Sequence, residues 1–239
     1  MALPADGRRV DIEGVPVGVD HLIGGTRVGS PSTFEDRSPL DWSNVLAEVA
    51  RGDAATAEAA LSAAVDGFAV WSAMSPHERG ERMHRLADLI EEHNDAIAIV
   101  ETLDMGFLYE SMQQRLVARG AANIRLYADL AMAHQERAWN ARGADHVVQR
   151  MPAGPAVVIT PWNAPFMLET WKVAPALAAG NSVVLKPAEW SPLSASLLAD
   201  LTVAAGFPPG VFNVVQGIGE EVGAALVADR RVRRISLTG

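Results

Sequence analysis

Asn163 has the type and position of a residue that could take part in chemistry. It follows Pro161, just after the apolar run 156–160. A side-chain amide at the end of a strand can donate its N–H to an oxyanion that develops during a reaction. A turn asparagine that caps the next helix explains the same residue equally well. The residues alone leave both interpretations open.

A second group of polar side chains follows the next apolar run, 182–186. Lys186 ends that run and Glu189 stands just beyond it. The lysine could donate to ribose hydroxyls or phosphate, and the glutamate could accept a hydrogen bond from a ribose 2′-hydroxyl. A surface ion pair is the plainer alternative. The carboxyl ends of parallel strands open onto a ligand crevice, so the pattern predicts a domain that binds a nucleotide or another small ligand.

A glycine pair, Gly217 and Gly219, follows another predicted strand and opens a predicted helix. The dinucleotide-binding fingerprint would need its third glycine at position 222, where Val222 stands and Gly223 comes one residue late. A tight strand–helix turn explains the pair as well. Three tryptophans flank these turns, and we expect them to fill the core or the walls of a crevice: Trp162, Trp171 and Trp190.

The elements that would position these side chains alternate along the chain. Strands are predicted near 156–160, 182–186, 211–215 and 234–238. Helices are predicted near 167–179, 191–205 and 219–228. Such alternation is typical of right-handed crossovers and a parallel sheet. The last strand, around 235–237, would then be an unpaired sheet edge.

A helical segment, residues 53–137, precedes the strands. Asp53 and Asn94 are predicted helix caps, 75–78 is a capping box, and Gly106 ends a helix. A long helix is predicted over 109–133. The expected core faces comprise Leu61, Val65, Phe68 and Trp71, then Met83, Leu86, Ala87 and Ile90, then Ile97, Val100 and Leu103.

The remaining segments are an amino-terminal arm, 1–52, and a linker, 138–155. Within the Gly- and Pro-rich residues 1–41, the one strand-like piece is 21–23. In the linker, Val147 and Val148 predict a short strand outside the main sheet. The part from 156 to 239 forms the parallel α/β unit.

Composition excludes several classes of protein. The 239 residues include 49% hydrophobic and 21% charged residues, which is ordinary for a globular protein. A net charge of −9 disfavours nucleic acid and anionic membranes as partners. There is no cysteine, so no thiol of this chain can act in catalysis or bind metal, and the six histidines lack metal-ligand spacing. No secretory signal or membrane span is visible, which favours the cytoplasm.

The motifs together closely resemble the aldehyde dehydrogenase superfamily over about residues 42–239. They are ITPWNAPF, TWKVAPALAAGN, VVLKPAE, SPLSA, AAGFPPGVFNVVQGIG, EVG and ISLTG, with AEVARG, AVWSAMSPHERGERMHRLADLIEEH and ETLDMG upstream. TWKVAP and NVVQGIG are similar to the branch that oxidises hydroxymuconic semialdehydes. The resemblance implies an α/β fold in which an amino-terminal helical segment joins a parallel Rossmann-like sheet, forming an incomplete cofactor domain.

The resemblance also assigns roles to residues. Asn163 matches the oxyanion-stabilising asparagine, and Lys172 matches a lysine next to the active-site region. Lys186 and Glu189 match the pair on the adenosine ribose, with the glutamate favouring NAD over NADP. The other matched cofactor positions are Ile159, Thr160, Pro161, Trp162, Gly219, Thr238 and Gly239. One departure is the segment SPLDWSN (38–44) in place of the family's usual turn, which puts the amino-terminal hairpin in doubt.

In the resembling family a cysteine thiolate attacks the aldehyde, hydride passes to NAD, and a glutamate-activated water releases the acid. Both catalytic residues would lie beyond position 239, so we expect a truncated chain that lacks the catalytic domain and is inactive alone. The whole enzyme would be a homodimer or homotetramer acting on a small-molecule aldehyde. A non-catalytic nucleotide-binding or interaction module is the alternative, and a thiol-dependent reductase of acyl phosphates fits the motifs less well.

Overall fold

The predicted strands of the second half lie in one sheet. The computed structural model describes residues 7–239, and its main sheet has the order β12-β9-β10-β11-β3-β4. Its strands are β3 (His21–Ile23), β4 (Thr26–Val28), β9 (Ala156–Ile159), β10 (Val183–Lys186), β11 (Phe212–Val214) and β12 (Arg234–Leu237). Strands β9 to β12 are parallel, as predicted. Strands β3 and β4 join antiparallel, so the sheet as a whole is mixed.

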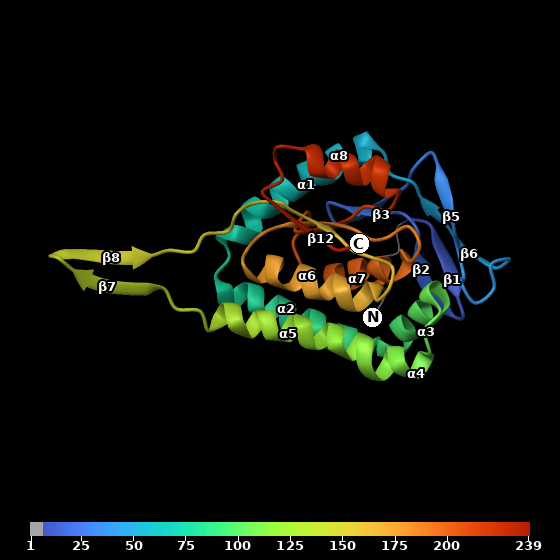
Figure 1. The fold of residues 1–239 in the computed structure, drawn as a ribbon, viewed down its shortest axis with the longest axis horizontal. Helices are drawn as coiled ribbons and strands as arrows, with labels where there is room; N and C mark the ends of the chain where they lie inside the picture. Colours follow the sequence, from blue (N-terminus) through green and yellow to red (C-terminus); the bar gives the residue numbers. More distant parts are fainter. Residues whose placement is uncertain (1–6) are drawn as a thin grey trace.

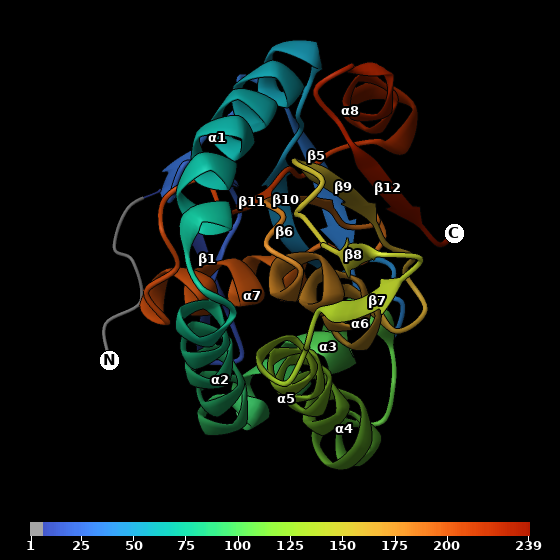
Figure 2. The ribbon, with the colours of Figure 1, turned by 90° about the vertical axis from the view of Figure 1, so that its left-hand side faces the viewer.

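Helices cover both faces of this sheet (Figures 1 and 2). One face carries α6 (Pro165–Ala178) and α7 (Leu193–Ala204), and the other carries α1 (Ala54–Ala73), the π-helical turn η2 (Gly219–Gly223) and α8 (Ala224–Ala228). A further layer packs on α6 and α7: α2 (Pro76–Glu92), α3 (Asn94–Met105) and α5 (Ala118–Met132). No helix within residues 7–239 is long and apolar enough to cross a membrane.

Side-chain alternation along β10 divides the core. Val183 and Leu185 belong to the apolar cluster under α6 and α7, whereas Val184 packs in the cluster with α1 and α8. Successive residues of a strand point to opposite faces. Lys186, two residues after Val184, therefore points to the α1 and α8 face. This places its side chain on the same face as Gly219.

The predicted helix starts are mostly confirmed. Asp53 and Ser75 cap α1 and α2, each with a complete capping box, and Gly106 ends α3 in the left-handed conformation. Asn94 is not a cap; it is the first residue of α3, and its amide donates to the Gln113 carbonyl. The predicted helix 109–133 is interrupted, because α4 (Tyr109–Ser111) and α5 flank a π-helical stretch, η1 (Met112–Val117).

The predicted core faces hold with one exception in α1. Val65 is 40% exposed, because the buried face of this helix runs through alanines such as Ala60 and Ala64. The small residues let α1 approach the sheet closely. A Cβ at Gly67 would lie 2.1 Å from the backbone carbon of Gly210, so no larger residue fits there. Phe68 and Leu103 are half-buried, and the other predicted core residues are buried.

The amino-terminal arm contains more strands than predicted. Besides β3 and β4 it forms the hairpin β1 (Arg9–Ile12) with β2 (Val15–Gly18) and the hairpin β5 (Thr33–Arg37) with β6 (Val45–Ala50). These strands are short, and charged residues interrupt the apolar pattern of β1 and β5, which hides their alternation in the sequence. The doubt about the hairpin around 38–44 was wrong: Ser38 and Asn44 close it with a backbone hydrogen bond of 3.0 Å. Residues 1–6 of the predicted arm lie outside the described residues.

The linker forms a separate antiparallel ribbon of β7 (Arg137–Ala141) and β8 (Ala144–Val148), which confirms the predicted strand at Val147 and Val148. The ribbon projects from the body of the molecule (Figure 1). Trp139, Val147 and Val148 are all exposed on it. At the other end of the chain, β12 is an edge strand with Ile235 51% and Leu237 61% exposed, as expected for an unpaired edge.

A buried histidine links acidity to stability. His21 in β3 is fully buried, and its Nδ1 accepts the backbone N–H of Gln216 at 3.0 Å. Burial lowers the pKa of His21 from 6.5 to about 4. The positive charges of Arg27 and Arg8 lower this pKa further, whereas the negative charges of Asp20 and Asp53 raise it and only partly offset the burial. The unfolded chain therefore binds this proton first as pH falls. The histidine's contribution to stability is present above pH 6.5 and is lost on acidification towards pH 4, by about 3 kcal/mol.

His21→Asn tests this prediction, because asparagine keeps an acceptor but does not titrate. The free energy of unfolding is measured from pH 7 to pH 4 by urea denaturation. The buried carboxyls of Glu101 and Glu169 have raised pKa values and act in the opposite direction, so the quantity to compare is wild type minus variant. We expect that difference to fall by about 3 kcal/mol towards acid pH. A constant difference contradicts the account.

Candidate functional site

Lys186, Glu189 and Gly219 meet at the carboxyl edge of β10. The Lys186 Nζ lies 2.7 Å from the Glu189 Oε2, and the backbone N–H of Gly219 is close enough to the same carboxylate to help lower its pKa. A Cβ added at Gly219 would lie 4.0 Å from the lysine Nζ. The lack of a side chain at this glycine therefore leaves open space beside the ion pair. Three predicted cofactor residues from two separate loops are thus brought together.

This pair is not the surface ion pair that was the alternative, because Lys186 is only 2% exposed. Burial lowers the pKa of Lys186, and the contact with Glu189 opposes that effect. Burial also raises the pKa of Glu189, but the Lys186 ammonium and the backbone N–H groups outweigh it and leave that pKa below its ordinary value. An ammonium and a carboxylate in contact at this edge offer one donor and one acceptor, which suits them to hydroxyl groups as hydrogen-bonding partners.

The ends of the neighbouring strands are held beside this pair. The Thr160 N–H donates to the Lys186 carbonyl, and the Thr238 N–H donates to the Ile159 carbonyl, each at 3.2 Å. The Thr160 Oγ1 is buried without a hydrogen-bonding partner among the described residues. A buried polar atom without a partner and a glycine-lined space beside two charged groups fit a polar ligand such as a dinucleotide.

Asn163 lies in the loop between β9 and α6, next to the buried Pro161. The residue at the N-cap of α6 is Ala164, and no side chain of the loop caps the helix. The interpretation of Asn163 as a helix cap is therefore wrong. Its side chain is exposed and makes no hydrogen bond with another residue of the described part. The amide is free to act on a bound molecule, while its oxyanion role stays a prediction.

The tryptophans do not fill the core. Trp162 and Trp190 are 58% and 61% exposed, and together with Trp42 they line a hollow of about 310 Å³. The Trp42 and Trp190 rings stack with centroids 6.1 Å apart. The expectation that the tryptophans form crevice walls is confirmed for Trp162 and Trp190. Trp171 lines a different hollow on α6, beside Lys172.

Lys172 does not join the other predicted residues. Its Nζ donates to the Ser236 Oγ of β12 at 3.1 Å, and its side chain is half-buried. It stands nine residues beyond Asn163, which corresponds to ~13 Å along a helix axis. The structure therefore separates Lys172 from the loop that carries Asn163. Gly239, the last predicted cofactor residue, is exposed next to Thr238.

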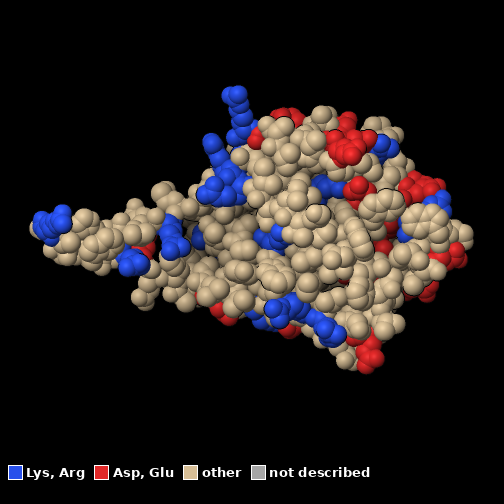
Figure 3. Space-filling model, viewed as in Figure 1, with Lys and Arg blue, Asp and Glu red and all other residues tan. Residues whose placement is uncertain are grey.

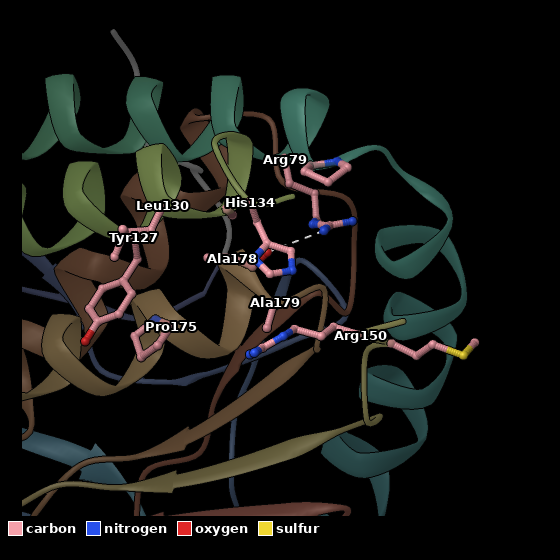
Figure 4. Close-up of a pocket in the computed structure, with 11 residues that line it drawn as sticks. Arg79, Tyr127, Leu130, His134, Arg150, Pro175, Ala178 and Ala179 are labelled. Atoms are coloured by element: carbon pink, nitrogen blue, oxygen red, sulfur yellow. Dashed lines mark hydrogen bonds between the residues drawn. The ribbon is translucent and has the colours of Figure 1, made fainter. Parts of the chain in front are cut away.

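A larger hollow lies at the opposite end of α6 and contains none of the predicted residues. It measures about 390 Å³ and is lined by Arg79, Tyr127, His134 and Arg150 among others (Figure 4). The Arg79 guanidinium donates to the carbonyls of Met74 and Ala178. It satisfies the last carbonyls of two helices, as basic side chains do at helix ends. This hollow is therefore explained by helix packing.

Charge gives no sign of a nucleic-acid surface on the face that Figure 3 shows. Basic side chains are scattered over the ribbon of β7 and β8 and the middle of the molecule, and acidic ones gather near β5 and β6. This face carries no continuous basic patch. Among residues 7–239, no group of three or more potential metal ligands lies close enough to hold a metal ion.

Sequence reasoning missed the groups that support the two loops. The Ser191 hydroxyl donates to the Trp162 carbonyl at 3.3 Å and so joins the loop of Asn163 to the loop of Glu189. The buried acids Glu101 and Asp104 of α3 hydrogen-bond to the backbone at the starts of α6 and α7. The two acids stand at helical spacing on the face of α3 that carries Ile97 and Val100, and acidic residues on an apolar face were the signal that could have revealed them.

Comparison with known proteins agrees with this architecture. Residues 27–239 match the model of the aldehyde dehydrogenase family. The chain is 41% identical over 230 residues to a 2-hydroxymuconic semialdehyde dehydrogenase of Pseudomonas sp. strain CF600, covering 92% of this chain and 47% of that protein. It is 37% identical over 223 residues to the 5-carboxymethyl-2-hydroxymuconate semialdehyde dehydrogenase of Escherichia coli, with the same coverage of 92% and 47%.

Solved structures show the same likeness. The aldehyde dehydrogenase KauB from Pseudomonas aeruginosa superposes with a TM-score of 0.90 at 37% identity, over 94% of this chain and 46% of that one. The NAD⁺ complex of an aldehyde dehydrogenase from Bacillus cereus superposes with a TM-score of 0.89 at 35% identity, over 92% and 46%. The chain spans about half the length of these relatives. By the extent of the family match and by its fold, the chain belongs to the aldehyde dehydrogenase family.

Proposed function

We propose that this chain binds NAD and supplies one oxyanion donor for the oxidation of an aldehyde to a carboxylic acid by the whole protein. The observation that carries the proposal is the meeting of Lys186, Glu189 and Gly219 at the carboxyl edge of the parallel strands. In that position, ligands bind in open α/β sheets. The whole protein would act as a homodimer or homotetramer.

Lys186 and Glu189 would hold the adenosine ribose, with Gly219 leaving room for the adenine side. The remaining cofactor contacts would come from Ile159, Thr160, Pro161, Trp162, Thr238 and Gly239. When bound, NAD supplies a hydride acceptor. The Glu189 carboxylate would repel the extra phosphate of NADP, which is why we propose NAD as the cofactor.

The Asn163 amide would donate to the oxygen of the aldehyde as negative charge develops on it. The chain contains no cysteine, so the thiol nucleophile of the proposed mechanism is not one of these residues. The division of work is then plain: these residues bind the cofactor and stabilise an oxyanion, and the nucleophile comes from elsewhere in the whole protein. Lys172, which lies on α6 apart from the Asn163 loop, would stand beside the active-site region and outside the oxyanion site itself.

The names of the two curated relatives favour semialdehydes as substrates. The test is NADH formation by the whole protein, measured with a semialdehyde that carries a carboxylate and with an uncharged aliphatic aldehyde of similar length. We expect oxidation of aldehydes, with higher kcat/KM for the semialdehyde. Oxidation of both at equal efficiency contradicts the substrate class, and no NADH from either contradicts the reaction.

A second candidate is a non-catalytic nucleotide-binding module, because the binding groups and the absence of cysteine suit it equally. Measuring NAD binding and aldehyde oxidation on the same whole protein tests this candidate directly. A whole protein that binds NAD but oxidises no aldehyde supports the module and contradicts the dehydrogenase.

Glu189→Gln removes the charge that would read the ribose. We expect weaker NAD binding and a lower ratio of NAD to NADP affinity, because a neutral amide no longer opposes the 2′-phosphate. Calorimetric titration of the chain with each nucleotide measures both affinities. Glu48→Gln, an exposed acid in β6, is the matched control and should change neither. An unchanged ratio would mean that Glu189 does not read the ribose.

A further inference from the structure

The two helices that follow the cofactor strands begin without caps of their own. The N-cap residues are Ala164 for α6 and Pro192 for α7, and neither supplies a capping side chain. The first N–H groups of a helix have no partner inside the helix and need one from elsewhere. The loops concerned are 160–164, with Asn163, and 187–192, with Glu189.

Helix α3 supplies both missing caps. The Glu101 Oε1 accepts the N–H of Phe166, the second residue of α6, at 3.3 Å. The Asp104 Oδ2 accepts the N–H of Leu193, the first residue of α7, at 2.9 Å. The two acids are three residues apart and therefore lie on one face of α3. Both are 0% exposed.

Burying these acids has an energetic cost that packing alone does not explain. No described residue forms a salt bridge with either carboxyl, and Asp104 contacts a second acid, Asp36 in β5. Burial raises the pKa of Glu101 to about 7, and burial together with the nearby acids raises the pKa of Asp104. Apolar residues of the same size would fill this space more favourably. What an apolar residue cannot do is accept the N–H groups of Phe166 and Leu193. The two acids therefore serve as hydrogen-bond acceptors for the first N–H groups of α6 and α7.

The two loops are also tied to one another, through the Ser191 hydroxyl and the Trp162 carbonyl at 3.3 Å. Ser191 is buried, and this hydrogen bond is partly buried. Three hydrogen bonds therefore anchor the arrangement, one from α3 to each helix start and one between the loops, and the Glu101 carboxyl also interacts with the side chain of Ser194 in α7. A shift of α3 would move both loops, whereas loss of one carboxyl would free one.

We propose that Glu101 and Asp104 are positioning residues, through which α3 sets the Asn163 loop and the Glu189 loop relative to each other. The roles given to Asn163 and Glu189 rest on the proposed function, but the anchoring does not. Glu101 would set the oxyanion donor, and Asp104 would set the ribose acceptor. Neither acid touches the substrate or the cofactor.

Amide hydrogen exchange of the chain tests the anchoring. Glu101→Met should speed exchange at the Phe166 N–H by about tenfold or more and leave the Leu193 N–H unchanged, because only one acceptor is lost. Asp104→Leu should do the reverse. Glu101→Gln and Asp104→Asn keep an acceptor oxygen and should restore slow exchange.

Glu169→Met is the matched control. Glu169 is a buried carboxyl on α6 with no hydrogen-bonding partner among the described residues, so its removal takes away burial cost without taking away a cap. It should leave both amides protected. If Glu101→Met or Asp104→Leu does not fold, Glu101→Ala and Asp104→Ala replace them. Each alanine variant should also speed exchange at one amide only, because water then reaches the N–H group that has lost its acceptor.

Cofactor binding gives the second readout. Asp104→Leu should weaken NAD binding severalfold and lower the NAD to NADP ratio, whereas Glu101→Met should leave both at wild-type values. In the whole protein, Glu101→Met should lower kcat without raising the KM for NAD. Asp104→Asn and Glu101→Gln should recover most of each loss.

Faster exchange at both amides in either single variant, at neither amide, or without recovery by Gln or Asn overturns the proposal. Glu189→Gln is titrated in parallel to separate the two claims. If Glu189→Gln leaves NAD binding unchanged, the ribose assignment fails. The exchange pattern at Phe166 and Leu193 then still decides whether α3 anchors the loops.

Discussion

Asn163→Ala in the whole protein is expected to lower turnover by roughly a hundredfold or more. The physical reason would be the loss of one donor to the proposed oxyanion, because such a donor stabilises a transition state strongly. The side chain is exposed and has no structural hydrogen bond in the described residues, so folding should be unaffected. The measurement is kcat from NADH formation under saturating aldehyde and NAD.

Two controls isolate the oxyanion role. Asn140→Ala removes an exposed asparagine from the projecting ribbon and should leave kcat unchanged. NAD affinity of Asn163→Ala should equal that of wild type, because the ribose pair is intact. Near-normal turnover of Asn163→Ala would reduce this residue to part of a turn.

Asp200→Ala is expected to destabilise the fold by roughly 3–5 kcal/mol. Asp200 in α7 is 0% exposed, and its Oδ1 lies 2.5 Å from the Nη2 of Arg27 in β4. Its Oδ2 lies 2.9 Å from the Nη1 of Arg9 in β1. Removing the carboxylate takes the charge of Asp200 away from the buried Arg27 guanidinium. The free energy of unfolding in urea measures the effect.

Glu220→Ala is the control for this prediction. It removes an exposed acid near α8 and should change the free energy of unfolding by at most ~0.5 kcal/mol. Since α7 also begins at the Asp104 anchor, the loss should be seen in global unfolding and not as faster exchange at the Leu193 N–H alone. A change below ~1 kcal/mol for Asp200→Ala contradicts a strongly coupled buried pair.

The second half of the fold was predictable because its elements are local. These elements can be recognised from a few neighbouring residues. Examples are the apolar run 182–186 and the glycine and proline turn at 206–210, and the strands and helices alternate along the chain. The capping boxes at Asp53 and Ser75 have the same local character. The hairpin strands β1, β2, β5 and β6 were missed because each is only four to six residues long, and the packing around them stabilises them more than their own composition does.

The candidate site was likewise predictable only in part. Residue type and spacing identified Lys186, Glu189 and Gly219, and the structure brings them together. Spacing could not show that Lys172 faces Ser236, because that depends on how α6 lies on the sheet. Nor could it show the caps from Glu101 and Asp104. Those hydrogen bonds join residues 65 and 89 positions apart, and no local pattern encodes such pairings.

Calorimetric titration of this chain with NAD, with wild type beside Lys186→Met, tests the central claim most directly. The account predicts saturable binding of one NAD by wild type and a large loss of affinity for Lys186→Met, because the buried ammonium and its ordering of Glu189 are both removed. Equal affinity of the two proteins, or no binding by a folded wild-type chain, would contradict the claim that this strand edge holds the cofactor.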